Sequence, residues 1–157
     1  MKRKNKIFVD LNHARNDRQR EIMEKIAKDG VCPFCPENLL KYHSKPIIKE
    51  TDWWFLTENM NPYEGARVHL LLIYKKHVEL PNDVSPEGLK DLFGLIDWAI
   101  KKFKIAGGAL LIRFGETGYA GGSVNHLHVH LIAGSAKIND PDAESLKVKV
   151  GYKRAVK

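Results

Sequence analysis

Asn125-His126-Leu127-His128-Val129-His130-Leu131-Ile132 is the stretch of this 157-residue chain that indicates its fold most directly. It lies in a predicted strand over about residues 124–133. Because successive side chains of a β-strand point to opposite faces, the three histidines stand in one row, while Leu127, Val129 and Leu131 enter the core. Three imidazoles therefore share one surface of the predicted sheet.

The histidine row has a chemical use at a phosphate. A neutral imidazole can attack phosphorus through one ring nitrogen, provided that the other nitrogen is held as a donor. A neighbouring imidazole and backbone N–H groups can then stabilise the charge on the phosphoryl oxygens. Gly121, Gly122 and Ser123 lie just before the strand and can supply such donors. Three ordinary histidines on a solvated face are the structural alternative, which the glycine-rich loop over residues 115–123 makes the weaker interpretation.

The hydrophobic pattern predicts an α+β domain: an antiparallel sheet of about five strands with one long helix and an added N-terminal helix. Ser85 caps the long helix, which reaches about Phe103. Its apolar residues recur at three- and four-residue steps and are expected to lie on the sheet. They are Leu89, Leu92, Phe93, Ile96, Ile100 and Phe103. Asn16 or Asp17 starts the N-terminal helix, and Gly30 ends it.

Four further segments have the β-branched, aromatic and apolar residues of strands. They span residues 45–50, 52–57, 68–74 and 109–114. Alternating apolar residues near the end of the chain predict an additional edge strand. These are Leu146, Val148, Val150 and Tyr152. The core is expected to include Trp53, Trp54 and Trp98.

The chain has a formal net charge of +7 and 43% hydrophobic residues. Its length and apolar content suit one compact domain. Its charge favours anionic partners such as nucleotides or, less strongly, nucleic acid. No apolar run approaches the length that spans a membrane, and the opening residues lack the hydrophobic region of a signal peptide. We therefore expect a cytoplasmic protein without membrane contact.

The segment over residues 126–132 resembles the signature His-φ-His-φ-His-φ-φ of the histidine-triad (HIT) superfamily. Upstream, Asn61-Pro62-Tyr63 and the stretch from His69 to His77 are similar to a second conserved region of that superfamily. The loop over residues 121–123 resembles its phosphate loop. The resemblance covers most of the chain.

The resemblance implies both an architecture and a reaction. A HIT-like catalytic domain would span residues 31–157, residues 1–30 would form a helical extension, and two copies of the chain would form a homodimer. His128 would attack the α-phosphate of a nucleotide-containing small molecule and form a covalent nucleotidyl intermediate. Ser123 and His130 would contact the phosphate. The other substrate-binding residues implied are Asn61, His69, Gly121 and Gly122, although His69 is equally well explained as a buried histidine satisfied by hydrogen bonds.

Cys32-Pro33-Phe34-Cys35 has the two-residue spacing of a zinc knuckle. Since the chain has no further cysteine, two histidines must complete a tetrahedral site. A redox role is the alternative, although nothing nearby resembles a thioredoxin-like βαβ unit. Several branches of the HIT superfamily carry such a zinc site, and the resemblance implies His77 and His126 as the remaining ligands. Zinc would then be structural, and the chemical step would need no cofactor.

We therefore expect a hydrolase that acts at the α-phosphate of a nucleoside phosphoramidate or a dinucleoside polyphosphate. His130 favours hydrolysis, because the uridylyltransferases of the superfamily carry glutamine at the third position of the row. A nucleotidyltransferase or phosphorylase of the same family stays open, as does a non-catalytic nucleotide-binding protein. A catalytic metal held by the three imidazoles is a further alternative. His13 and His43 match no motif and are expected at the surface.

Overall fold

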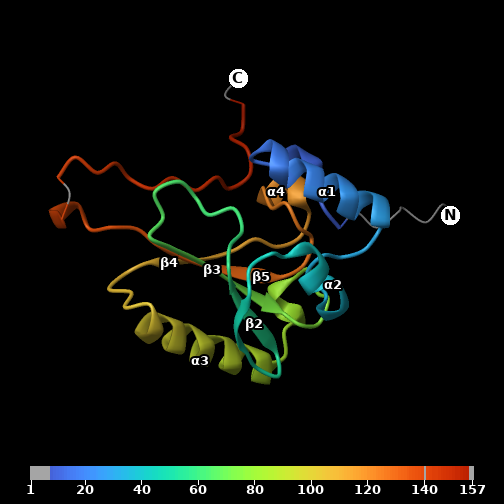
Figure 1. The fold of residues 1–157 in the computed structure, drawn as a ribbon, viewed down its shortest axis with the longest axis horizontal. Coiled ribbons are helices and arrows are strands. Elements are labelled where there is room, and N and C mark those ends of the chain that lie inside the picture. The colour runs from blue at the N-terminus through green and yellow to red at the C-terminus, as the bar shows by residue number, and fades with distance from the viewer. Residues whose placement is uncertain (1–7, 140, 156–157) are drawn as a thin grey trace.

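The computed structural model describes residues 8–139 and 141–155. Its centre is a five-stranded antiparallel sheet in the order β1-β2-β3-β5-β4 (Figure 1). The strands are β1 (Ile47–Glu50), β2 (Trp54–Glu58), β3 (Val68–Tyr74), β4 (Ala109–Ile112) and β5 (His128–Ala133). The predicted α+β fold is confirmed. Residues 1–7 of the predicted extension lie outside the described residues. Among the residues that are described, no helix is long and apolar enough to span a bilayer.

The central strands β3 and β5 are buried along their whole length. Leu72 of β3 pairs with Val129 of β5, and both side chains belong to the main core. Leu71 pairs with His130, and Leu71 belongs to a second apolar cluster. The alternation predicted for the histidine strand is confirmed, because the apolar residues that follow each of the three histidines all enter the main core. They are Leu127, Val129 and Leu131.

The long helix α3 (Pro86–Lys102) lies along the sheet as predicted (Figure 1). The side-chain oxygen of Ser85 accepts a hydrogen bond from the backbone nitrogen of Gly88 at 3.0 Å, which caps the helix. Nε1 of Trp54 donates to the carbonyl oxygen of Gly88 at 2.8 Å and ties the first turn to β2. Trp54 is fully buried, and Trp53 and Trp98 pack partly buried against the same core.

The buried face of α3 differs from the predicted stripe. Leu92 and Ile96 are buried as predicted, but three of the predicted contacts are exposed. These are Leu89, Phe93 and Ile100. The buried positions are Gly88, Leu92, Leu95, Ile96 and Ala99. The rotation follows from close packing at Gly88, where a Cβ atom would lie only 3.0 Å from the ring of Tyr74.

The N-terminal helices α1 (Asp17–Asp29) and α2 (Pro36–Tyr42) lie on the other side of the sheet from α3 (Figure 1). Asn16 caps α1 by accepting a hydrogen bond from the backbone nitrogen of Gln19 at 2.8 Å, and Gly30 ends it in the left-handed conformation. Both ends were predicted. The buried side chains of this region are Val9, Met23, Ile26 and Tyr42. The short helices are η1 (Leu11–His13), η2 (Pro81–Asp83), α4 (Thr117–Ala120) and η3 (Lys137–Asn139).

The histidine strand is shorter than predicted, because β5 begins at His128 rather than near Val124. The residues before it pair with other segments. Val124 forms an isolated bridge with Val9, and the backbone nitrogen of Leu127 donates to the carbonyl oxygen of Val78 at 2.8 Å. His126 therefore lies outside the regular strand.

The edge strand predicted over residues 146–152 does not form, and Val150 and Tyr152 are both exposed. Alternating residues become a strand only where the chain runs along a sheet edge and pairs with it. This segment instead passes the loop that precedes β5, where the carbonyl oxygen of Lys149 accepts a hydrogen bond from Nη2 of Arg113 at 2.8 Å. The prediction failed because sequence alternation does not supply a pairing partner.

Gly108, at the entry to β4, generates a stability prediction. A Cβ atom there would lie 2.5 Å from the carbonyl oxygen of Ile132, whereas one at Gly107 would meet nothing within 4 Å. We predict that Gly108→Ala lowers the free energy of unfolding by about 1–3 kcal/mol through overpacking. Gly107→Ala is the matched control and should change it by less than about 0.5 kcal/mol. Urea denaturation measures both, and equal effects would contradict the close approach of the two strands.

Candidate functional site

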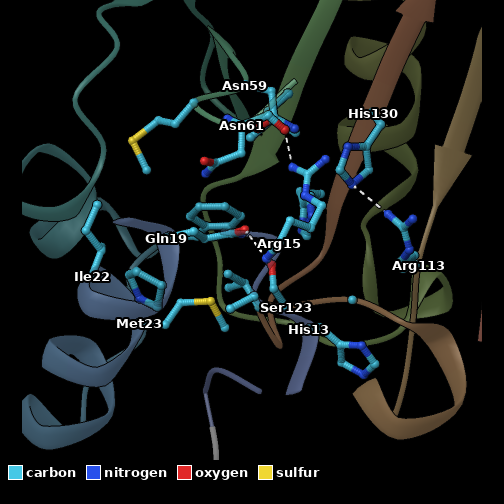
Figure 2. A pocket seen from close by; sticks show the side chains of 18 of the residues that line it. His13, Arg15, Gln19, Ile22, Met23, Asn59, Asn61, Arg113, Ser123 and His130 are labelled. Atoms are coloured by element: carbon cyan, nitrogen blue, oxygen red, sulfur yellow. Dashed lines mark hydrogen bonds between the residues drawn. The ribbon is translucent and has the colours of Figure 1, made fainter. Parts of the chain in front are cut away.

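A cavity of about 220 Å³ lies over the face of β5 that carries His128 and His130. Figure 2 shows residues of α1 on one side of it and His130 with Arg113 on the other. Its apolar lining includes Ile22, Met23, Ile26, Phe34, Tyr42 and Leu71. Its polar lining includes Asn61, Gly121, Gly122, Ser123, His128 and His130. The structure thus brings these sequence-predicted residues together around one space.

The ring of His128 is held in one tautomer. Its Nδ1 lies 2.6 Å from the carbonyl oxygen of His126. Because a carbonyl oxygen can only accept, Nδ1 carries a proton, and in the neutral ring Nε2 keeps its lone pair. The ring of Phe34 packs edge-on against His128, with 5.0 Å between ring centroids.

Three effects set the charge of His128. Burial lowers its pKa to about 4, the hydrogen bond to His126 opposes that shift, and the positive charge of Arg113 adds to it. The imidazole is therefore neutral near neutral pH.

His130 is linked to a second buried histidine, His69 of β3. Nδ1 of His130 lies 2.9 Å from Nε2 of His69, whose Nδ1 accepts the backbone N–H of Tyr63 at 3.1 Å. Nδ2 of Asn59 lies 3.0 Å from the same Nε2 of His69. Among the described residues, His69 does not line the cavity, so it supports His130 from behind instead of facing a ligand.

This histidine pair lies in a positive and water-poor environment. Burial, followed by the charges of Arg15 and Arg113, lowers the pKa of His69 to about 4. Burial also lowers the pKa of His130 well below its usual range, and the neighbouring His128 and Arg113 add to that shift. Both rings are therefore neutral near neutral pH.

The loop before β5 presents small residues to the cavity. Gly121 follows α4 in the left-handed region at φ +71, where a side chain would be strained and would also press on the backbone of Gly151. A Cβ atom on Gly122 would lie 3.4 Å from the side chain of Arg113. Ser123 is fixed by its carbonyl oxygen, which accepts the backbone N–H of Asp10 at 3.0 Å.

A second cluster brings together the four predicted metal ligands, whose donor atoms all lie within 4.8 Å of one another. Nδ1 of His126 is 3.3 Å from Sγ of Cys32 and 3.2 Å from Nδ1 of His77. Sγ of Cys35 is 3.5 Å from Nδ1 of His77. Two thiols and two imidazoles at such spacing can hold a metal ion.

The orientation of His126 suits a metal ligand. Its Nε2 donates to the carbonyl oxygen of Tyr74 at 2.6 Å, which leaves the lone pair of Nδ1 toward the thiols. A backbone partner for the second ring nitrogen is the usual arrangement behind a metal-bound histidine. On the other ligand, Nε2 of His77 lies 3.6 Å from Oε1 of Glu79.

The alternative of a catalytic metal held by the three triad imidazoles does not fit this geometry. Nδ1 of His126 faces the cysteines, Nδ1 of His128 donates to a backbone carbonyl, and His130 contacts His69 and Arg113. Among the described residues, the three imidazoles form no common group of ligand atoms.

The structure adds two arginines that sequence reasoning missed. Nη1 of Arg113 lies 3.2 Å from Nε2 of His130, and its Nη2 donates to the hydroxyl of Tyr63 at 2.7 Å. Arg15 donates to the carbonyl oxygen of Asn61. Arg113 could have been found, because it stands two residues before the glycine-rich loop. Arg15 lies in no motif.

The surface assignment of His13 and His43 was wrong. The side chain of His13 is 5% exposed and lies 3.5 Å from Asp10. His43 is buried, with its Nε2 2.8 Å from Oγ1 of Thr57. Both residues line the cavity. His13 precedes α1 and His43 follows α2, and these helices fold over the sheet and enclose both side chains. Neither is therefore a neutral control for the site.

Comparisons with known proteins agree with this arrangement. An uncharacterized HIT-like protein of Chlamydia trachomatis is 34% identical over 93 residues, which cover 54% of this chain and 82% of that protein. A solved structure described as a HIT-like protein is 29% identical, with a TM-score of 0.52, covering 63% of this chain and 96% of the other. A hypothetical histidine triad nucleotide-binding protein from Sulfolobus tokodaii shares the fold, with a TM-score of 0.54 at 23% identity over 78% of this chain and 82% of the other.

The HIT domain family model matches residues 42–137, which is more than half of the chain. The match contains β1 to β5 and the histidine row, whereas α1 and the cysteine pair precede it. From this match and the Chlamydia relative, the chain belongs to the HIT domain family.

Proposed function

We propose that the protein hydrolyses nucleotide conjugates at the α-phosphate, with His128 as the nucleophile. Proteins of the HIT family bind nucleotide substrates. The observation that carries the proposal is the hydrogen bond from Nδ1 of His128 to the carbonyl oxygen of His126. It leaves the lone pair of Nε2 available on a ring that lines the cavity.

The reaction would proceed in two displacements. In the first, Nε2 of His128 bonds to the α-phosphorus, the bond from phosphorus to the leaving group breaks, and its electron pair goes to the leaving atom. His130, Ser123 and backbone N–H groups of the loop hold the phosphoryl oxygens. In the second, water attacks the same phosphorus and releases a proton to the solvent, the electron pair of the N–P bond returns to Nε2, and the mononucleotide departs from a neutral histidine.

We assign the nucleoside to the apolar side of the cavity. Ile22 and Met23 of α1 line it together with Phe34 and Leu71, and such a surface suits the faces of a nucleobase. On this view residues 31–157 form the catalytic domain, and described residues of the extension over residues 1–30, between Asn12 and Ile26, complete its substrate pocket.

The metal proposed for the second cluster is zinc. Two cysteines and two histidines are a usual structural zinc set, and the backbone bond of His126 presents the correct ring nitrogen. Cys32 and Cys35 precede α2, whereas His77 follows β3, so a bound ion would tie the N-terminal region to the sheet. The four side chains would fill all four coordination positions of the ion and leave none open for a substrate. A structural role is therefore the better assignment.

A homodimer is proposed through the edge strand β4. This strand ends the sheet within the described residues, and its outer side has no strand partner there. Leu110 is 45% exposed and Phe114 is 58% exposed, which is unusual for an unpaired edge. Pairing with β4 of a second copy would cover both the backbone edge and these side chains.

The nucleophile assignment predicts that His128→Asn lowers turnover by about 10³-fold or more, while mononucleotide affinity is retained because the loop and fold are unchanged. Release of mononucleotide from an adenosine phosphoramidate, diadenosine polyphosphates and nucleotide sugars measures turnover. Retained affinity is the control for folding. Near-parental turnover in the variant would remove His128 as nucleophile and favour a different reaction or a binding-only protein.

The zinc assignment predicts about one equivalent of zinc in protein purified without chelator. His126→Ala should lose the metal and lower the melting temperature by about 5 °C or more. His130→Ala is the matched control, since His130 is equally buried but lies outside the cluster, and it should retain the metal. Elemental analysis measures the zinc content of the parental chain and of both variants. A parental protein without zinc would refute the assignment.

The interface assignment predicts that Leu110→Lys converts a dimer into a monomer, because the ammonium group would be forced into the apolar contact. Leu40→Lys is the matched control on α2, where Leu40 is 77% exposed and far from the edge strand in the chain. Light scattering across micromolar concentrations gives the mass. A monomeric parental chain, or two variants with the same mass, would count against a dimer through β4.

A further inference from the structure

Two guanidinium groups, those of Arg15 and Arg113, line the cavity near His130 (Figure 2). Arg113 follows β4 and contacts both His130 and the hydroxyl of Tyr63. Arg15 precedes α1, and its Cζ lies 4.9 Å from the centre of the Tyr63 ring. Although Arg15 is an exposed residue, partial desolvation of its guanidinium lowers its pKa, Tyr63 raises it, and the charge of Arg113 lowers it further. Tyr63 thus holds two like charges near each other.

The cavity lining contains no carboxylate that could neutralise these charges. Its described residues include Arg15, Arg113 and Lys149 but no aspartate or glutamate. Nε of Arg113 is buried and has no hydrogen-bond partner among the described residues. Like charges without a counter-charge raise the free energy of a site, so this arrangement favours the binding of an anion.

Donors outnumber acceptors around His69 and His130, because Nδ2 of Asn59, Nη1 of Arg113 and the backbone N–H of Tyr63 all face ring nitrogens. A guanidinium and a backbone N–H can only donate, so Nε2 of His130 accepts from Arg113 and Nδ1 of His69 accepts from Tyr63. In two neutral rings, the nitrogens that face each other at 2.9 Å would then both carry protons. An anion beside Arg113 relieves the conflict between the two rings, because Arg113 then donates to the anion, His130 can carry its proton on Nε2, and its Nδ1 can accept from Nε2 of His69.

We propose that Arg15 and Arg113 form a second anion site, which holds the phosphate group next to the α-phosphate of the substrate. The inference rests on the function proposed for His128. It selects substrates in which a P–O–P anhydride follows the α-phosphate, over phosphoramidates with an amine leaving group.

The chemistry of the first displacement explains the preference. As Nε2 of His128 bonds to the α-phosphorus, the bond from that phosphorus to the bridging oxygen breaks. The oxygen keeps the electron pair and leaves as part of an anionic phosphate. Arg15 and Arg113 stabilise that negative charge through charge-assisted hydrogen bonds, which a leaving amine cannot accept in the same way.

Arg15 gives the N-terminal extension a part in specificity. It lies outside the HIT domain match at residues 42–137, whereas Arg113 lies within it. The second anion site would therefore combine one residue of the family domain with one residue of the segment that precedes it.

Calorimetric titration can test the site without turnover, on the His128→Asn chain. Monophosphates and diphosphates of adenosine, guanosine, cytidine and uridine are compared at physiological ionic strength. For the base that binds tightest, the diphosphate should bind about tenfold tighter than the monophosphate, or more. Arg15→Gln and Arg113→Gln should each reduce that ratio, and Arg15→Lys should restore part of it.

Arg18→Gln is the matched control, because it removes the same charge from a residue that is exposed on α1 and does not line the cavity. It should leave the ratio unchanged. A ratio near one, an equal reduction by Arg18→Gln, or no nucleotide binding would each overturn the proposal. The nucleophile assignment fails by a different result, which is retained turnover in His128→Asn. That result would not change the ratio of diphosphate to monophosphate affinity.

Discussion

The antiparallel pairing of β3 with β5 is the constraint on which the rest of the structure depends. Its register places Leu72 beside Val129 and Leu71 beside His130. Because side chains alternate, the same six-residue strand supplies apolar residues to the main core and two histidines to the opposite face. A shift of one residue would turn the imidazoles into the main core and the apolar residues toward the cavity, so the register fixes the fold and the candidate site together.

The two clusters of the site meet at His126. Its Nδ1 faces the thiols, its Nε2 donates to the carbonyl oxygen of Tyr74, and its own carbonyl oxygen accepts a hydrogen bond from Nδ1 of His128. A metal ion bound to Nδ1 of His126 would also fix the position of the His126 carbonyl oxygen, which is the acceptor that sets the tautomer of His128. Structural metal binding and the proposed covalent chemistry are therefore connected through one residue, although His126 does not line the cavity.

Sequence reasoning predicted what depends on local periodicity. It identified β3, the caps of α1 and α3, and the separation of Val129 from the histidines, because alternation and capping act over a few residues. It failed where distant segments decide. The rotation of α3 depends on contacts of Gly88 with Trp54 and Tyr74, and the cavity positions of His13, His43 and Arg15 depend on packing by the N-terminal helices. The cysteine pair could be linked to His77 and His126 only through family resemblance.

Nε2 of His128 is the atom that we expect to form the covalent intermediate. The hydrogen bond from Nδ1 to the carbonyl oxygen of His126 leaves the lone pair on Nε2. Rapid alkaline quenching of a reaction in progress, with mass spectrometry of the digested chain and NMR of the modified peptide, locates the bond directly. We predict a nucleotidyl group on Nε2 of His128, stable to alkali and labile to acid as a phosphoramidate. An adduct on Nδ1, on another residue, or no adduct during rapid turnover would contradict this account.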